Sequence, residues 1–222
     1  MNNSKLLTTA GKASILFIVF AFSTLCFAQD SDKVAKELDS VALKMFNDVN
    51  ERNYDGIMDM SYPKLFEFVP REVMVNVFKS MFEGNDEFTV DIPKLIPEYE
   101  ISEVFKVEKD SAEFAFINYD LKMSMTFHDI AEEGFDEEGK EMMVDMMKMQ
   151  GMEAEFVSDN TIDVIMPNRM TIMVNDKLTN GNWAMINYDT NSPLFYQILS
   201  APILEKAKDY YQDLLIEHKK KD

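Results

Sequence analysis

The chain has 222 residues, of which 46% are hydrophobic and 12% aromatic, and its 40 acidic residues outnumber 22 basic ones to give a formal net charge of −18 at pH 7. This composition predicts a globular protein and argues against a disordered tail. The charge argues against a nucleic-acid-binding protein, since phosphates require a basic surface, and it disfavours docking on anionic lipid.

The first 28 residues have the organisation of a cleavable secretory signal. Lys5 and Lys12 form a cationic segment without any acid, and an apolar run from Ala13 to Leu25 follows directly. A membrane-spanning helix needs about 20 apolar residues to cross the hydrocarbon core, and this run is shorter. We therefore expect residues 1–28 to be removed, which leaves no membrane span in the mature chain.

Cleavage is expected directly after Ala28. Cys26 and Ala28 place small residues at the −3 and −1 positions, and Gln29 would begin the mature chain. Acylation of Cys26 is disfavoured because the bulky Leu25 precedes it. The mature protein would have no cysteine and no disulfide, and we expect it in the periplasm or outside the cell.

Helical segments are predicted first in the mature chain. Apolar residues at helical spacing predict an amphipathic helix from Val34 to Val49, and Tyr54-Asp55-Gly56 leads into a short helical turn. Pro63 is expected to open another short helix, and Pro70 a third that ends at Gly84. The expected core face of this last helix consists of Val73, Met74, Val77, Phe78 and Met81.

From Phe88 onward the hydrophobic period changes to two, which predicts strands. The expected strands cover residues 88–92, 104–107, 113–127, 154–157, 161–166, 169–174 and 182–188. A helix is predicted from Met142 to Met149, after an acidic connection. Asn180-Gly181 favours a hairpin before the last strand.

The C-terminal segment from Ser192 to His218 is predicted to be helical, with an interruption at Pro202. Its apolar stripe is expected to pack on its own domain; a partner-docking role for the stripe is the alternative. We therefore predict one α+β domain over residues 29–222, with a core at about 34–189 and C-terminal helices at 192–218.

The order of these elements resembles the NTF2-like, cystatin-related cone fold, in which helices precede a curved antiparallel sheet. Two local features carry the resemblance: Asn53-Tyr54-Asp55 after the first helix, and Gly181-Asn182-Trp183-Ala184-Met185-Ile186 on the final strand. The resemblance covers roughly Val34 to Asp189, and the C-terminal helices and Met-rich segment depart from it. It implies a cavity between helices and sheet, which members use for catalysis, ligand binding or adhesion, so the fold alone selects no function.

Methionines cluster unusually between residues 142 and 152. On a helix, Met142, Met146 and Met149 share one face. Thioethers are soft ligands for Cu(I), so a Met-rich Cu(I)-binding protein is one hypothesis. The competing interpretation is an adaptable apolar face that packs on the sheet or covers a pocket.

Candidates for acid–base chemistry are few. His128 with Asp129 is weakened because neighbours on a strand point to opposite faces. Asp120 and Asp163 lie within strand patterns, where a carboxylate is more often on the wet face. The acidic run 132–138 lacks the alternating spacing of a calcium loop, and a solvated loop is favoured.

The leading prediction is an exported, non-enzymatic domain that binds a small apolar ligand or a cell-envelope protein. Met142, Met146, Met149 and Trp183 are its candidate binding residues, and no catalytic residue, metal ligand or cofactor is predicted. The alternative is an isomerase or hydrolase that uses Asp120 with Tyr119 or Tyr188 in a cone pocket.

Overall fold

The structure, a computed structural model, describes residues 32–109, 111–128, 134–190, 192–218 and 220. The predicted signal, including Ala28 and Gln29, lies outside these residues. The first described element is a helix over residues 32–51, and the chain divides into two units inside it, after Ser40. The sheet and all later helices belong to the unit that begins at Val41. No helix among the described residues is long and apolar enough to cross a membrane.

Two long antiparallel strands form the centre of the sheet. β4 (Ala112–Phe127) pairs with β6 (Thr161–Asn175) along almost its whole length. The free edge of β4 is covered in turn by β1 (Phe88–Asp91), β2 (Tyr99–Ile101) and β3 (Phe105–Val107). The free edge of β6 pairs with β5 (Glu153–Phe156) and β7 (Ala184–Asn187), so seven antiparallel strands make one sheet.

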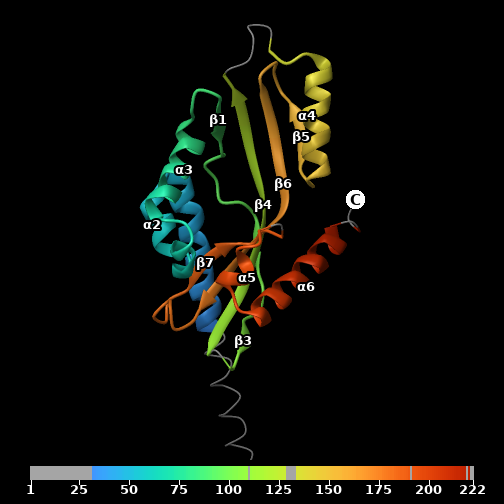
Figure 1. Cartoon of the computed structure of the whole chain (residues 1–222). Coiled ribbons are helices and arrows are strands. Elements are labelled where there is room, and N and C mark those ends of the chain that lie inside the picture. The colour runs from blue at the N-terminus through green and yellow to red at the C-terminus, as the bar shows by residue number, and fades with distance from the viewer. Residues whose placement is uncertain (1–31, 110, 129–133, 191, 219, 221–222) are drawn as a thin grey trace, which may run out of the picture. The chain divides into compact units, whose positions relative to one another are not determined.

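Helices flank the sheet on both faces (Figure 1). On one side lie α2 (Tyr54–Met60), the 3₁₀ helix η1 (Pro63–Glu67) and α3 (Arg71–Glu83). On the other lie α5 (Phe195–Ile198) and α6 (Ala201–His218), while α4 (Glu137–Met149) packs near β5. The predicted α+β class, with N-terminal helices, an antiparallel sheet and C-terminal helices, is confirmed.

A bulge interrupts the register of the central pair. Tyr119 lies opposite Arg169 and Leu121 opposite Met166, so two residues of β6 face Asp120 alone. The sequence predicts separate strands at 161–166 and 169–174, and this is wrong, since β6 is continuous through the bulge. The extra residue reverses the side-chain alternation, so Met166 and Arg169 project from the same face of the sheet.

The face of the sheet below α5 and α6 is filled. Phe114 and Phe116 of β4 and Ile172 of β6 pack with Ile203 and Ala207 of α6, and all five are buried. This packing confirms that the apolar stripe of the C-terminal helix faces its own domain. The helix break comes at Leu199, and Pro202 lies in the first turn of α6, where proline is tolerated.

Two local predictions differ from the structure, and a third is confirmed by it. Val73 and Val77 are exposed, so α3 turns Met74, Phe78, Met81 and Phe82 inward, and the predicted face is partly wrong. α4 begins five residues earlier than predicted because the Asp136 carboxylate caps it by accepting from Gly139 N at 2.8 Å. The hairpin between β6 and β7 is confirmed, with residues 176–183 as its connection.

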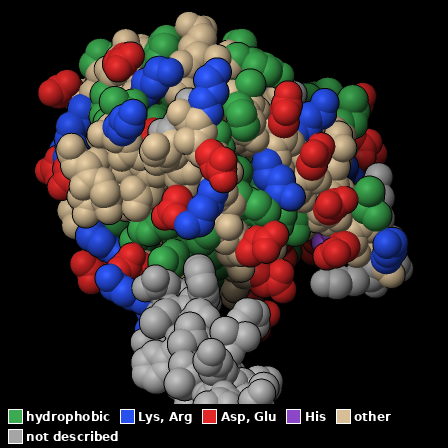
Figure 2. Space-filling view, turned by 90° about the horizontal axis from the view of Figure 1, so that it is seen from below, with side chains coloured by type: hydrophobic (Ala, Val, Ile, Leu, Met, Phe, Trp, Pro, Cys, Tyr) green, Lys and Arg blue, Asp and Glu red, His purple; other side chains and the backbone are tan. Residues whose placement is uncertain are grey.

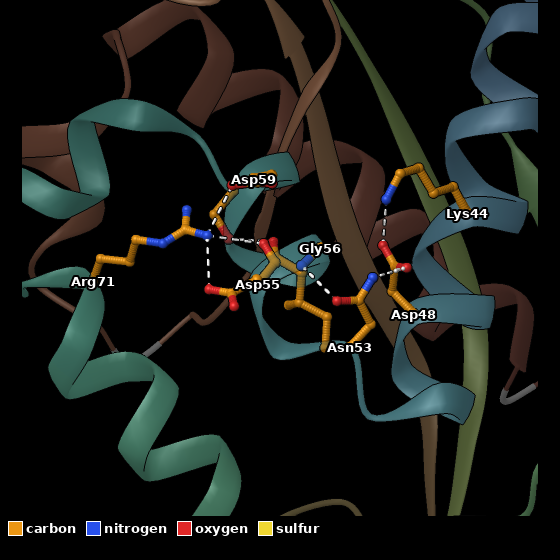
Figure 3. A network of polar contacts seen from close by, with 9 residues as sticks. Lys44, Asp48, Asn53, Asp55, Gly56, Asp59 and Arg71 are labelled. Carbon is orange, nitrogen blue, oxygen red and sulfur yellow. Dashed lines mark hydrogen bonds and ion pairs between the residues drawn. The ribbon is translucent and has the colours of Figure 1, made fainter.

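A polar network joins the first helix to α2 (Figure 3). The buried Asp48 carboxylate accepts hydrogen bonds from Lys44 Nζ and, at 2.9 Å, from Asn53 Nδ2. Asn53 Oδ1 in turn accepts from Gly56 N at 3.1 Å and caps α2. One buried carboxylate therefore fixes the angle at which the chain enters α2.

Arg71, at the start of α3, completes this network from the other side (Figure 3). Its Nη2 lies 2.8 Å from Asp59 Oδ1 and 3.2 Å from Asp55 Oδ1, and it also donates to the Asp55 carbonyl at 3.0 Å. The guanidinium therefore ties α3 to α2, and the two helices together stand over one face of the sheet.

A cavity between the N-terminal helices and the sheet

The second face of the sheet encloses a cavity of about 850 Å³. The first helix, α2, η1, α3, the β1–β2 connection, β4, β6 and β7 all contribute to its wall. Phe195 and Ile198 of α5, which pack in the core of the other face, also contribute to it. Every lining residue belongs to the unit from Val41 onward.

Most of the wall is apolar. Met74, Phe78 and Met81 of α3 face Leu121 and Met123 of β4 across the cavity. These five side chains are all half-buried, whereas sheet residues under the closed core are fully buried. Thioether and aromatic side chains of this kind adapt to the shape of an apolar ligand.

A polar row crosses the floor of the cavity from β4 through β6 to β7. Tyr119 is the cross-strand partner of Arg169, and Thr171 is the partner of Asn187. Directly opposed residues and residues two apart share a face of the sheet, so all four side chains lie on the cavity side. The Thr171 hydroxyl, which is buried, donates to Asn187 Oδ1 at 2.8 Å.

Burial raises the pKa of Tyr119 above its ordinary value, while the Thr171 hydroxyl and the positive charge of Arg169 act in the opposite direction. The Tyr119 ring is held edge-on against Phe46, with ring centroids 5.1 Å apart. Tyr119 is therefore a protonated, fixed hydroxyl at neutral pH, next to a cation.

Acidic residues stand at the edge of the cavity. Glu98, Asp120 and Asp189 contribute to the lining, and all three are exposed. Asp120 Oδ1 accepts a hydrogen bond from Asn168 N at 2.9 Å, so this carboxylate stabilises the bulge. Asp120 is thus not the buried acid that cone-type isomerase chemistry would use.

The other candidate acid–base residues lie away from the cavity. Asp163 is exposed on the opposite face of the sheet and accepts from Ser124 Oγ at 2.6 Å. Tyr188 packs against Phe195 and Tyr211 in the α5–α6 core. The structure therefore does not bring Asp120 and Tyr188 together in the cavity.

His128 is exposed and contacts Thr89 Oγ1 through Nε2, and it does not line the cavity. Asp129, its proposed partner, lies outside the described residues, as do Glu132 and Glu133 of the acidic run. Glu137 and Glu138 form the first turn of α4, so the predicted solvated loop ends earlier than expected.

The methionine face of α4 points to solvent. Met142, Met146 and Met149 are 62%, 49% and 88% exposed, and none lines the cavity. Met143 and Met147, beside this face, are half-buried. The predicted packing of this face on the sheet is therefore wrong for its three defining residues, and Cu(I) binding stays a prediction.

Trp183, the residue directly before β7 in the chain, is buried and does not line the cavity. Of the candidates chosen from the sequence, Tyr119 and Asp120 line the cavity, but Arg169 and Thr171, which also line it, are not among them. The sequence signal that points to Arg169 is a single arginine within a strand pattern that is mostly apolar. Among the described residues, no cluster of three or more His, Cys, Asp or Glu side chains is arranged to hold a metal ion.

Charged side chains of both signs cover the surface seen in Figure 2, with no large uniform patch of either. No protein-family model, curated protein or solved structure matches this chain.

Proposed function

We propose that this protein is an exported binding protein that takes a small, largely apolar ligand into the cavity between its N-terminal helices and its sheet. The observation that carries the proposal is the cavity itself, at about 850 Å³. Ligand-binding pockets typically enclose about 300–1,000 Å³ and combine an apolar wall with a few polar groups. The cavity has this composition, because apolar side chains of α3 and β4 form most of its wall and the polar row crosses β6.

The β1–β2 connection offers an apolar entrance. Leu95 and Ile96 are 58% and 43% exposed, and both contribute to the cavity wall. Exposed large apolar side chains beside an apolar enclosure are typical of a ligand-binding groove. A ligand would cover them, which lowers the free energy of the complex.

The order of helices and strands and the cavity on one face of the sheet also support assignment to the NTF2-like group, which we include in the proposal. The predicted signal segment is consistent with this proposal, because export would bring the domain to a compartment that contains lipids and other apolar molecules. Catalysis is not part of the proposal, since the described carboxylates that line the cavity, those of Glu98, Asp120 and Asp189, are all exposed.

The test uses N-phenyl-1-naphthylamine, a neutral probe that fluoresces in apolar surroundings, with mature protein lacking residues 1–28. Leu121→Trp should fill part of the cavity and weaken probe binding at least tenfold, because the indole occupies the space next to Met123. Leu215→Trp, on the outer face of α6, is the matched control and should leave binding unchanged.

Thermal unfolding of both variants verifies that they are folded. Absence of probe fluorescence with the wild-type protein would contradict the proposal. Equal binding by wild type and Leu121→Trp would show that the probe binds elsewhere.

A further inference from the structure

We infer that the ligand carries an anionic head group, a carboxylate on an alkyl or similarly apolar body, and that Arg169 binds this head group inside the cavity. The inference rests on the proposed ligand-binding function and specifies its chemistry. It is drawn from the placement of Arg169, the more buried of the two cationic side chains in the lining, beside a largely apolar wall; the other, Lys122, is exposed.

Arg169 is fixed in the sheet rather than at the end of a loop. It directly follows the bulge residue Asn168, and its cross-strand partner is Tyr119. The bulge sets the face from which Arg169 projects, so Leu121, Met166 and Arg169 share the cavity side. Without the extra residue, the alternation of β6 would turn the guanidinium to the opposite face.

The guanidinium lacks a partner in the described part of the chain. The other two arginines are engaged, Arg71 with two aspartates and Arg52 with Asp91 at 3.9 Å and the Phe82 ring. Arg169 is half-buried, yet within the described residues its side chain has no ion pair or hydrogen bond. Partial burial of an unpaired cation carries a desolvation cost that an anion in the cavity would offset.

A carboxylate fits this position better than a neutral polar group. Guanidinium presents a planar fork that binds both oxygens of a carboxylate, and such charge-assisted bonds are stronger than neutral ones. The Tyr119 hydroxyl lies alongside, and Met166 and Leu121 begin the apolar wall directly next to the cation. A head group at Arg169 would therefore place an attached alkyl chain against this wall.

The competing occupant is an amphipathic cation, which the acids at the rim could attract. Glu98, Asp120 and Asp189 are exposed, so solvent screens their charges, and the Asp120 carboxylate already accepts from Asn168 N. Arg169 is more buried than any of them, and charge interactions strengthen as water is excluded. The arrangement therefore favours an anion at the floor over a cation at the rim.

The experiment compares three ligands with the same chain and different head groups: dodecanoate, dodecanol and dodecylammonium, each below its aggregation concentration. Displacement of N-phenyl-1-naphthylamine from the mature protein gives their affinities at pH 7.5. We expect dodecanoate to bind roughly ten- to hundredfold more tightly than dodecanol, the range expected of hydrogen bonds to charged groups. Dodecylammonium should bind most weakly.

Arg169→Met should remove the advantage of dodecanoate over dodecanol; this advantage is a ratio of two affinities measured in one variant, so it does not depend on how the substitution changes binding of the probe. Lys79→Met is the control, because it removes one positive charge from an exposed position on α3 that does not line the cavity, and it should preserve the advantage. Arg169→Lys keeps the charge without the planar fork and should retain part of the preference, which provides a second test if Arg169→Met does not fold.

The outcomes separate the two proposals. Equal affinity for dodecanoate and dodecanol, or preference for dodecylammonium, would overturn the anionic head group while the binding function stands. Failure of the neutral probe and of all three ligands to bind would overturn the binding function itself. An advantage of dodecanoate that persists in Arg169→Met would overturn the role of Arg169 and assign the head group to another cation.

Discussion

The Asp120 carboxylate on β4 accepts a hydrogen bond from the backbone N–H of Asn168 on β6, at 2.9 Å across the bulge. Asn168 has φ +54°, a left-handed conformation that asparagine tolerates better than most residues. This pair holds the point at which β6 changes its side-chain alternation. The placement of Met166 and Arg169 on one face, and with it the polar floor of the cavity, depends on this contact.

Replacement of Asp120 tests its structural role. Asp120→Ala should lower the free energy of unfolding by about 1 kcal/mol, because the Asn168 N–H loses its acceptor. Asp120→Asn keeps an acceptor oxygen at the same position and should be close to wild type. Urea unfolding measures both, and a similar loss in both variants would assign the effect to the charge instead of the hydrogen bond.

Gly56 is expected to tolerate no side chain. A Cβ there would lie 2.4 Å from Asn53 Nδ2 and 2.6 Å from Asp48 Oδ2, so Gly56→Ala should disrupt the α2 cap and cost about 1–3 kcal/mol. Gly139→Ala is the control in the first turn of α4, where the nearest atom is 3.0 Å away. Thermal unfolding compares them, and equal melting temperatures would contradict the tight network at Asp48.

Alkaline pH should weaken the fold through Tyr62. Burial and the hydrogen bond that its hydroxyl donates to Asp176 Oδ2, at 2.6 Å, raise the pKa of Tyr62 well above its ordinary value. A raised folded-state pKa contributes stability that is present below the unfolded pKa, about 10, and is lost as pH rises above it.

The stability difference between wild type and Tyr62→Phe should therefore be constant up to about pH 9 and shrink above about pH 10. Urea midpoints between about pH 7 and about pH 11, which span the unfolded pKa, measure this difference. The other tyrosines are present in both proteins, so their contributions cancel. A difference that grows with pH would contradict the assigned direction of the shift.

Oxidation should distinguish the methionines of α4 from those of the sheet. Met149 is 88% exposed and Met142 62%, whereas Met170 is 2% and Met173 0% exposed. Peroxide should convert the first two to sulfoxides much faster, because reactivity follows exposure. Peptide mass spectrometry at short times gives the rates. Protection of Met142 and Met149 to the level of Met173 would show that this face is covered in solution.

Much of the fold can be predicted from the sequence because hydrophobic period reports secondary structure directly. Alternation over residues 113–127 predicts β4 almost to its ends, and Pro70 and Gly84 bracket α3. β2 escapes prediction because three residues are too few to establish a period. The sequence at the bulge in β6 predicts a turn between two strands, because Pro167 and Asn168 are typical of turns.

The candidate site cannot be predicted in the same way. Tyr119 and Arg169 are far apart in the sequence, and only the register of β4 with β6 makes them neighbours. Likewise, period alone does not say which side of an amphipathic helix is buried. Met142, Met146 and Met149 share a face as predicted, but α4 lies with that face outward.

The sequence by itself therefore determined the α+β class, the order of the elements and the acidic character of the chain, since each follows from local composition and spacing. Only the tertiary structure decided where the sheet is filled and where it is hollow. That difference arises from long-range packing: α5 and α6 fill one face, while a cavity lies between the other face and the helices α2 and α3.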